Sequence, residues 1–198
     1  MALKDGRIAV LFSGGIDSML LAERAHKEER LGALVFIDYG QPASSYEMKT
    51  VNAWASERGY EVDSIEVRIE GVDECMDIGA EAEGLRILPG RNMIMCAHAA
   101  NIAASKDCTV VWYGANADDK DYPDCSINFV CAMNDILGAS SVDVLIEAPL
   151  HYMSKKEIIH ESQKIGMDLS KAWSCYQPLN GCPCGKCHSC QERIKAMA

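Results

Sequence analysis

The feature that most constrains this chain is the run Ser13-Gly14-Gly15-Ile16-Asp17-Ser18, which stands between two segments of different periodicity. Residues 8–12 are an apolar run typical of a buried strand, and residues 19–30 have the apolar spacing of a helix. A glycine turn from a strand into a helix points several backbone N–H groups at one anion. Ser13 and Ser18 add hydroxyl donors, and Asp17 adds a carboxylate that can meet a metal ion. The run therefore predicts a phosphate-binding turn.

The spacing of this turn excludes two common nucleotide motifs. A Walker P-loop needs Gly-x4-Gly-Lys-Ser/Thr, and a dinucleotide fingerprint needs Gly-x-Gly-x-x-Gly; neither is present. A tight connection without any ligand is the alternative, because Gly-Gly pairs are common turn formers. Six residues in register at the first junction of strand and helix favour the anion site.

The rest of the chain alternates strand and helix patterns. Such alternation predicts an α/β fold with a doubly wound, mainly parallel five-stranded sheet and helices on both faces. Ligands of these sheets bind beyond the carboxyl ends of the strands, where the glycine turn lies. Residues 71–90 lack a clear period and are expected to form a loop with one short helix. The further strands are expected over residues 31–38, 62–69, 109–114 and 142–146. Helices are expected over residues 44–58 (capped by Ser44 or Ser45), 92–106 and 126–137 (capped by Ser126, ended by Gly138), and after the capping box that Ser154 and Glu157 form.

Charge and composition restrict the kind of protein. The chain has 198 residues, 48% of them hydrophobic, and a formal net charge of −10. The charge argues against a general nucleic-acid or anionic-membrane surface, which needs clustered Lys and Arg. No segment approaches the ~20 apolar residues of a membrane span, and the first apolar run is too short for a secretory signal. We expect a cytoplasmic protein that acts on small molecules, with no nucleic-acid or membrane partner.

Four cysteines near the end of the chain, Cys175, Cys184, Cys187 and Cys190, have the spacing Cys-x8-Cys-x2-Cys-x2-Cys. Four thiolates in a tetrahedron are a typical structural zinc site, so residues 173–198 are expected to be a small zinc knuckle, a zinc-binding tail that packs on an α/β domain of residues 1–172. There are three alternatives. Cys182 or His188 could replace one of the four ligands, two of the cysteines could form a redox pair, or the four could hold an iron–sulfur cluster. The dispersed cysteines are expected to be packing residues: Cys75, Cys96, Cys108, Cys125 and Cys131.

Both motifs together resemble the 7-cyano-7-deazaguanine synthase family, or QueC family, of the pyrophosphate-loop ATP pyrophosphatase superfamily. The resemblance runs in order through nearly the whole chain. Its further segments are Asp38-Tyr39-Gly40-Gln41, Pro89-Gly90-Arg91-Asn92, Tyr122-Pro123-Asp124-Cys125, Pro149-Leu150 with Lys155 and Glu157, and Trp173-Ser174-Cys175-Tyr176.

Four departures from the family pattern fall around the expected base-binding side. Pro42-Ala43 follow Gln41 where members usually carry Arg-His, and Ser126 replaces an arginine. Residues 118–121 differ from the usual Thr-Asp-x-Ser-Gly, and the stretch 71–88 is shorter than usual. The departures leave ATP chemistry unaffected and concern the acceptor.

The resemblance implies an adenine nucleotide alpha hydrolase-like fold and an ATP-dependent carbon–nitrogen ligase. The implied reaction converts 7-carboxy-7-deazaguanine and ammonia to 7-cyano-7-deazaguanine through acyl-adenylate and amide intermediates, releasing AMP and pyrophosphate. ATP, Mg²⁺ and Zn²⁺ are the implied cofactors, and a homodimer is suggested. Ammonia would come from solution or from a partner, because the chain has no room for a glutaminase domain.

The site residues follow from the matched positions. Arg91 can fork onto paired oxygens, whereas Lys155 offers a point charge or is only a solvated residue of a first turn. Asp124 can accept from a guanine-like edge or be a simple turn aspartate, and Tyr39 and Tyr122 can stack on a purine or pack. The expected catalytic residues are Ser13, Asp17, Ser18, Arg91 and Lys155. ATP is expected at Val10, Leu11, Phe12, Ser13, Gly14, Gly15, Ile16, Asp17, Ser18, Met19 and Leu20, the acceptor at Tyr39, Gln41, Arg91, Asp119, Tyr122 and Asp124, and zinc at Cys175, Cys184, Cys187 and Cys190.

Three other functions stay open at this point. The first is a related pyrophosphate-loop enzyme that adenylates a different carboxylated acceptor. The second is a tRNA sulfur-transferase with cysteines as the sulfur carrier, against which the acidic balance weighs. The third is a zinc-knuckle binding module without catalysis.

Overall fold

The computed structural model describes residues 6–69 and 88–197 of the chain. Within them a five-stranded sheet has the order β3-β2-β1-β4-β5, and every neighbouring pair of strands is parallel. The strands are β1 (Arg7–Leu11), β2 (Leu31–Asp38), β3 (Val62–Glu66), β4 (Cys108–Trp112) and β5 (Leu145–Glu147).

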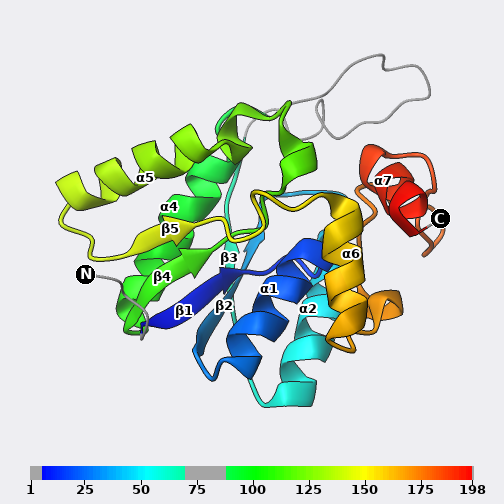
Figure 1. Ribbon diagram of the computed structural model, residues 1–198, viewed down its shortest axis with the longest axis horizontal. Coiled ribbons are helices and arrows are strands. Elements are labelled where there is room, and N and C mark those ends of the chain that lie inside the picture. Colours follow the sequence, from blue (N-terminus) through cyan, green and yellow to red (C-terminus); the bar gives the residue numbers. More distant parts are fainter. Residues whose placement is uncertain (1–5, 70–87, 198) are drawn as a thin grey trace.

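Helices cover both faces of the sheet, with α4 and α5 on one side and α1, α2 and α6 on the other (Figure 1). The side chains of β1 show why both faces need a cover. Ile8 and Val10 belong to the core under α1, α2 and α6, whereas Ala9 belongs to the core under α4 and α5. A strand buried on both faces has to be apolar where it is covered, as residues 8–11 are, whereas Arg7 at the start of β1 is exposed. The helices are α1 (Ile16–Lys27), α2 (Ser44–Arg58), α4 (Arg91–Ser105), α5 (Ile127–Ala139), α6 (Lys155–Lys164) and α7 (His188–Met197).

The strand order reverses at β1, because β2 and β3 lie on one side of it and β4 and β5 on the other. In an open sheet of this kind the crevice for a ligand lies beyond the carboxyl ends of the strands at the reversal. The turn after β1 and the segment after β4 meet at this point. The sheet therefore places the predicted phosphate turn in the crevice, and the predicted doubly wound fold is confirmed.

Several predicted element ends shift. β3 stops at Glu66 and β5 begins only at Leu145. Neither Ser44 nor Ser45 caps α2; its N-cap is Ala43, because Ser44 Oγ donates to Asp38 Oδ2 at 2.5 Å instead. Gly138 lies inside α5, which ends one residue later. The short helix expected within 71–90 falls largely outside the described residues.

Two predicted caps are confirmed. Ser126 Oγ accepts from the backbone N–H of Phe129 at the start of α5. Ser154 and Glu157 form the predicted capping box at the start of α6. A capping box fixes where a helix begins, so the position of Lys155 in the first turn follows from the sequence.

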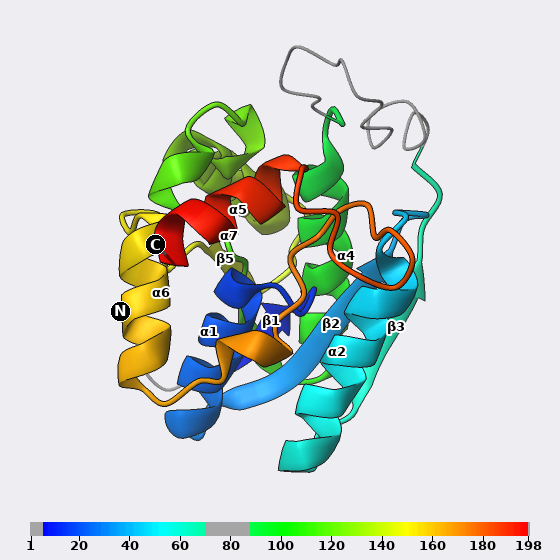
Figure 2. The same ribbon diagram turned by 90° about the vertical axis from the view of Figure 1, so that its right-hand side faces the viewer.

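The tail from residue 173 folds back onto the α/β layers. Its helix α7 lies beside α6 and across the face that Figure 2 turns to the viewer. Trp173 N–H donates to Gly14 O at 2.9 Å. The Arg193 guanidinium of α7 donates to Ala172 O at 2.7 Å and to Leu169 O at 2.6 Å. Among the described helices, none combines the length and apolar character that crossing a bilayer needs.

Candidate functional site

The turn after β1 has a backbone that only glycine accommodates well. Gly14 has φ +77°, and a Cβ there would lie 2.8 Å from Thr50 Cγ2. Gly15 is the N-cap of α1 with φ −71° and ψ 162°, and no side chain caps this helix. Ser18 Oγ donates to Gly15 O at 3.1 Å and lies 3.3 Å from Ser13 Oγ. The uncapped first-turn N–H groups of α1 are therefore available to an anion.

Asp17 is the charged centre of this turn. Its Oδ2 accepts from Lys155 Nζ at 2.5 Å and from Asn116 Nδ2 at 3.3 Å, and the Asp17 and Lys155 side chains are each only 19% exposed. Its Oδ1 is buried and has no hydrogen-bond partner among the described residues. Gly114, after β4, makes this approach possible, because a Cβ there would lie 3.1 Å from Asp17 Cβ. A buried carboxylate oxygen without a partner fits a cation ligand.

A cavity of 260 Å³ opens beside this turn. Its wall combines the exits of β1, β2 and β4 with residues from the first turns of α2, α4, α6 and α7. Polar residues that line it include Ser13, Asp17, Ser18, Gln41, Glu47, Arg91, Asn116, Asp119, Lys155, His188 and Glu192.

Another part of the wall is built around Arg91, the first residue of α4. Its guanidinium lies 5.9 Å from the centre of the Tyr39 ring, which is itself buried. Gln41 has little freedom to bind anything further, since Oε1 accepts from Tyr39 N–H at 2.8 Å and Nε2 donates to Glu47 Oε2 at 2.8 Å. Burial raises the pKa of the Glu47 carboxyl to about 7 against the hydrogen bond from Gln41 and the charge of Arg91.

The segment after β4 closes a third side. Asn116 N–H donates to Asp119 Oδ2 at 3.0 Å, and burial raises the pKa of the Asp119 carboxyl. Tyr122 lines the cavity. Asp124 does not belong to the lining; its Oδ2 accepts from the backbone N–H of Asn92 at 3.1 Å, in the first turn of α4.

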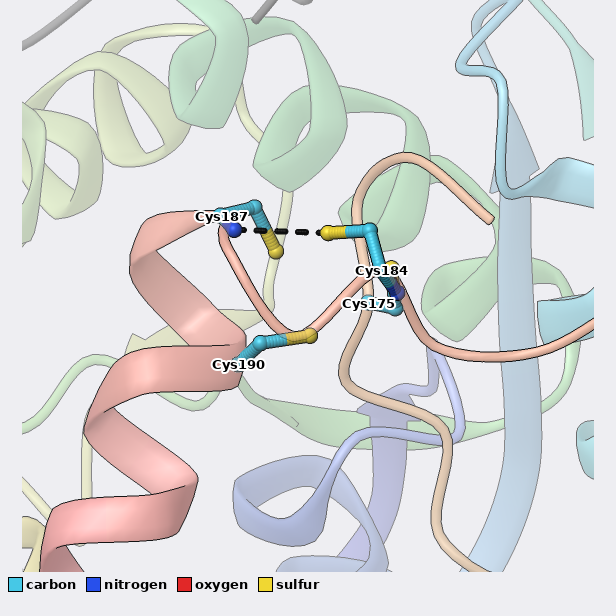
Figure 3. Close-up of side chains that lie close together, drawn as sticks. All are labelled: Cys175, Cys184, Cys187 and Cys190. Carbon is cyan, nitrogen blue, oxygen red and sulfur yellow. Dashed lines mark hydrogen bonds between the residues drawn. The ribbon is translucent and has the colours of Figure 1, made fainter. Parts of the chain in front are cut away.

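The four predicted zinc ligands come together. The sulfur atoms of Cys175, Cys184, Cys187 and Cys190 lie within 4.8 Å of one another, whereas Cys182 is exposed and neither it nor His188 belongs to the group. Figure 3 shows the four side chains converging from the loop and from the start of α7. Four sulfur donors at this separation fit a tetrahedral metal site.

Backbone amides support the sulfur atoms of this cluster. Cys184 N–H donates to Cys175 Sγ at 3.2 Å, and Cys187 N–H donates to Cys184 Sγ at 3.3 Å, the contact dashed in Figure 3. Burial disfavours the Cys184 thiolate, but hydrogen bonds from the N–H groups of Lys186 and Cys187 and from the Cys175 and Cys187 side chains lower its pKa to about 7. Burial raises the pKa of the Cys175 and Cys190 thiols. Metals bind thiolates, so the amides favour the metal-binding form at Cys184.

The comparisons with known proteins agree with this geometry. The family model described as "Queuosine biosynthesis protein QueC" matches residues 7–198. The chain belongs to the QueC family. It is 32% identical over 203 residues to the 7-cyano-7-deazaguanine synthase of Pseudoalteromonas atlantica, and the match covers 96% of this chain and 93% of that one.

Solved structures share the fold of this QueC-family chain at low identity. The U34-tRNA thiolase NcsA from Methanococcus maripaludis, with its [4Fe-4S] cluster, aligns with a TM-score of 0.51 and 13% identity over 98% of this chain and 65% of that one. The NH3-dependent NAD synthetase from Campylobacter jejuni, in complex with nitrate, aligns with a TM-score of 0.50 and 14% identity over 85% of this chain and 68% of that one. Both likenesses concern the fold alone, and they agree with the α/β architecture described above.

The cavity unites most of the site residues expected for a QueC-family member. All five expected catalytic residues line it. Of the expected ATP residues, Leu11, Phe12, Ser13, Gly15, Asp17 and Ser18 line it, whereas Val10, Met19 and Leu20 are buried in the core, where they hold α1 against β1. Gly14 and Ile16 are not part of the lining. Of the expected acceptor residues, all but Asp124 line the cavity: Tyr39, Gln41, Arg91, Asp119 and Tyr122.

Sequence reasoning missed several residues that line the QueC-family cavity. Three of them lie close in sequence to recognised motifs: Glu47, Tyr113 and Asn116. A search that covered each connection after a strand and the first turn of the following helix would have included Glu47 and Asn116. His188 and Glu192 come from α7, and no local pattern indicates that the cysteine tail folds back over the cavity. Tyr113 has a buried hydroxyl that lacks a partner within the described part of the chain, so it offers a further donor to a ligand.

Proposed function

We propose that this chain is an ATP-dependent ligase that converts 7-carboxy-7-deazaguanine and ammonia to 7-cyano-7-deazaguanine, releasing AMP and pyrophosphate. One observation carries the proposal. A single cavity at the strand-order reversal joins an uncapped glycine turn, the Asp17–Lys155 pair and Arg91. Membership of the QueC family and relatives named 7-cyano-7-deazaguanine synthase support the same reaction.

The first step follows from the chemistry of the acid. A carboxylate is a poor electrophile because its oxygen is a poor leaving group. Attack of that oxygen on the α-phosphorus of ATP makes an acyl-adenylate and expels pyrophosphate. The N–H groups of residues 14–18 and the Ser13 hydroxyl would hold the departing pyrophosphate, and Lys155 would offset its charge. Positioning and charge neutralisation account for most of such a transfer.

The nitrile needs two rounds of activation. Ammonia displaces AMP from the acyl-adenylate and leaves an amide. A second adenylation on the amide oxygen allows loss of AMP and forms the nitrile, so two ATP are used for each nitrile. Arg91 is placed to bind anionic oxygens of the acid or of the adenylate, because its guanidinium lines the cavity over Tyr39.

Two metal ions fit the donor groups. Mg²⁺ would be held by Asp17, whose Oδ1 is buried without a partner among the described residues, and would neutralise polyphosphate charge. Zn²⁺ would be held by Cys175, Cys184, Cys187 and Cys190, where it would fix the tail. The cysteine cluster would then position α7, which supplies part of the cavity wall.

The deazapurine would lie between the tyrosines and Arg91. Tyr39 and Tyr122 offer rings for stacking, and Asp119 offers a carboxylate to the donor edge of the base. Gln41 and Asp124 would support the lining residues without touching the base, since Gln41 bonds to Tyr39 and Glu47, and Asp124 bonds to Asn92.

We also propose that residues 1–172 and 173–198 are the ATP-binding domain and its zinc tail, in a cytoplasmic homodimer that takes ammonia from solution or from a partner.

A second candidate keeps ATP but changes the acid. Ser126 stands where QueC-family members usually have an arginine, and its hydroxyl caps α5 and donates to Pro123 O at 2.8 Å. No cation is supplied from this position. Because serine stands where family members usually have a cation, a different carboxylated acceptor is the second candidate.

The test is to measure pyrophosphate and AMP released from ATP with 7-carboxy-7-deazaguanine and ammonium, and to identify the product by mass spectrometry. We expect release that depends on the acid and a nitrile with two AMP per molecule. Release with other deazapurine acids, and none with this one, would favour the second candidate. Absence of acid-dependent release with every acid would overturn both.

A further inference from the structure

Five carboxylates line the described part of the cavity, and four of them have a charged or backbone partner. Asp17 is bonded to the Lys155 ammonium, and Glu192 pairs with Lys195. Asp118 accepts from the backbone N–H of Lys155, and Asp119 from that of Asn116. The fifth carboxylate, Glu47, accepts from the neutral side-chain amide of Gln41.

Glu47 is held at one place in the wall. Its Oε2 accepts from Gln41 Nε2 at 2.8 Å, and Gln41 is fixed in turn by Tyr39 N–H at 2.8 Å and by Ile37 O at 3.3 Å. The first turn of α2 packs on the anion turn, because a Cβ on Gly14 would lie 3.4 Å from Glu47 O. The positioned Glu47 carboxylate therefore lines the same cavity as the anion turn, on the side of Gln41 and Tyr39.

The second half of the proposed reaction needs a base. Ammonium is the main form of ammonia near neutral pH, and it has no lone pair with which to attack a carbonyl carbon. A general base works best when its pKa lies near the working pH and when it reaches the proton directly. The other carboxylates of the lining are each paired with a cation or a backbone N–H, which leaves Glu47 as the one whose partner is a neutral side chain.

We propose that Glu47 is the base that takes a proton from ammonium in the cavity, an inference that rests on the proposed ligase function. One N–H bond of ammonium breaks, and its proton goes to Glu47. The lone pair of the resulting ammonia forms the C–N bond. The C–O bond to AMP breaks, AMP leaves with the electron pair, and the second proton on nitrogen passes to solvent. Glu47 then returns its own proton to solvent.

The surroundings of Glu47 suit this role. Burial raises the pKa of the Glu47 carboxyl to about 7, and the hydrogen bond from Gln41 opposes this rise. The other charged groups that act on it are Arg91 of α4, which lowers the pKa, and Asp38 at the end of β2, which raises it. Tyr39 also stands near, and burial raises the pKa of its hydroxyl, so it is neutral. A carboxyl in this range accepts and releases protons near neutral pH.

The test separates adenylation from ammonia attack in Glu47→Gln, which keeps an oxygen for Gln41. Hydroxylamine is the second nucleophile, because it is largely unprotonated at neutral pH and needs no base before it attacks. We expect ATP–pyrophosphate exchange with the acid, and hydroxamate formation from hydroxylamine, to stay within about three-fold of wild type. Product formation from ammonium should fall by about 100-fold or more near pH 7, less so at higher pH. Glu61→Gln, an exposed carboxylate away from the cavity, is the matched control and should change none of the three.

Equal losses with ammonium and hydroxylamine would overturn the proposal, and so would an equal loss of exchange. If Glu47→Gln does not fold, the same comparison in Glu47→Asp decides, because a shortened carboxylate should slow ammonium more than hydroxylamine. Failure of the wild-type protein to catalyse acid-dependent exchange is a separate result and overturns the ligase function instead.

Discussion

At the scale of single residues, Gly14 combines two demands that can be separated experimentally. Gly14 and Gly59 have nearly the same backbone, φ +77° and +76°, but only at Gly14 would a Cβ meet other atoms within 4 Å. Both alanine variants should lose about 1–2 kcal/mol of stability, because a residue with a Cβ is strained in the left-handed conformation. Gly14→Ala should lose more and should also lose ATP binding, because Thr50 and the turn must shift.

Thermal unfolding and ATP titration calorimetry of the two glycine variants check this expectation. Equal stability and equal ATP affinity in Gly14→Ala and Gly59→Ala would show that the contact with Thr50 has no role.

Glu47 gives a second prediction, on stability. Its folded pKa of about 7 lies above the 4.5 of an ordinary glutamate, so the folded state binds more protons between these values and stability falls as pH rises through them. Glu47→Gln removes this titration. The variant should match wild type near pH 4 and be more stable by about 1–3 kcal/mol near pH 8. Urea unfolding of wild type and variant at pH 4 and pH 8 measures this difference in stability, and the control Glu61→Gln should show no dependence of the difference on pH. An equal stability difference between Glu47→Gln and wild type at the two pH values would contradict the prediction.

At the scale of elements, the start of α4 depends on a side chain from a 3₁₀ turn (Pro123–Cys125) about thirty residues later in the chain. The α4 N-cap is Gly90, which offers no side-chain cap, and Asp124 Oδ2 accepts from the Asn92 N–H instead. Asp124→Ala should lower stability by about 0.5–2 kcal/mol, and Asp124→Asn should restore most of it, because an amide oxygen also accepts. Unfolding curves and the KM for the acid distinguish the roles. A stable Asp124→Asn with a much higher KM would show that the carboxylate also contacts the base.

The C-terminal tail provides a matched pair of cysteines. Cys187 belongs to the sulfur cluster, whereas Cys182 is exposed outside it. Cys187→Ser should lose nearly all bound metal and the order of the tail, because a tail this small depends on the metal for its fold. Cys182→Ser should keep both. Metal analysis and limited proteolysis check this, and a folded, metal-free and inactive Cys187→Ser would instead indicate a chemical role for the thiol.

Element types followed from local patterns, and element ends did not always do so. Strands and helices are marked by periodicities of 2 and 3.6 residues, which are visible in the sequence. Capping residues such as Ser126 and Ser154 also act within a few positions, so the helix starts that they determine could be predicted. Ser44 misled because its hydroxyl is recruited by Asp38 at the end of β2, six residues before it. The late start of β5 is likewise set by pairing with β4 and not by its own apolar run.

At the scale of the whole molecule, the glycine turn could be predicted because one short run contains it. The completed cavity could not, since its wall joins Ser13, Lys155 and His188 from opposite ends of the chain. Only the family resemblance connected Lys155 to the turn in advance. Glu47 and α7 were missed as parts of the cavity wall, because no pattern in their own segments indicates which distant surface they face.

The same long-range construction predicts how ligand binding affects stability. A ligand that fills the cavity contacts segments from both ends of the chain, so it binds only when they are folded together. Mg²⁺–ATP at about 100 times its Kd should add about 2.7 kcal/mol, which for a chain of this size raises Tm by about 5–10 °C. We expect Trp173 of the tail and Trp112 of β4 to unfold in one transition, so the rise should be the same by circular dichroism and by tryptophan fluorescence. Lys155→Met, which removes the ammonium beside Asp17, should lose most of the rise. Two separate transitions, of which ATP shifts only one, would mean that the tail does not help to form the nucleotide site.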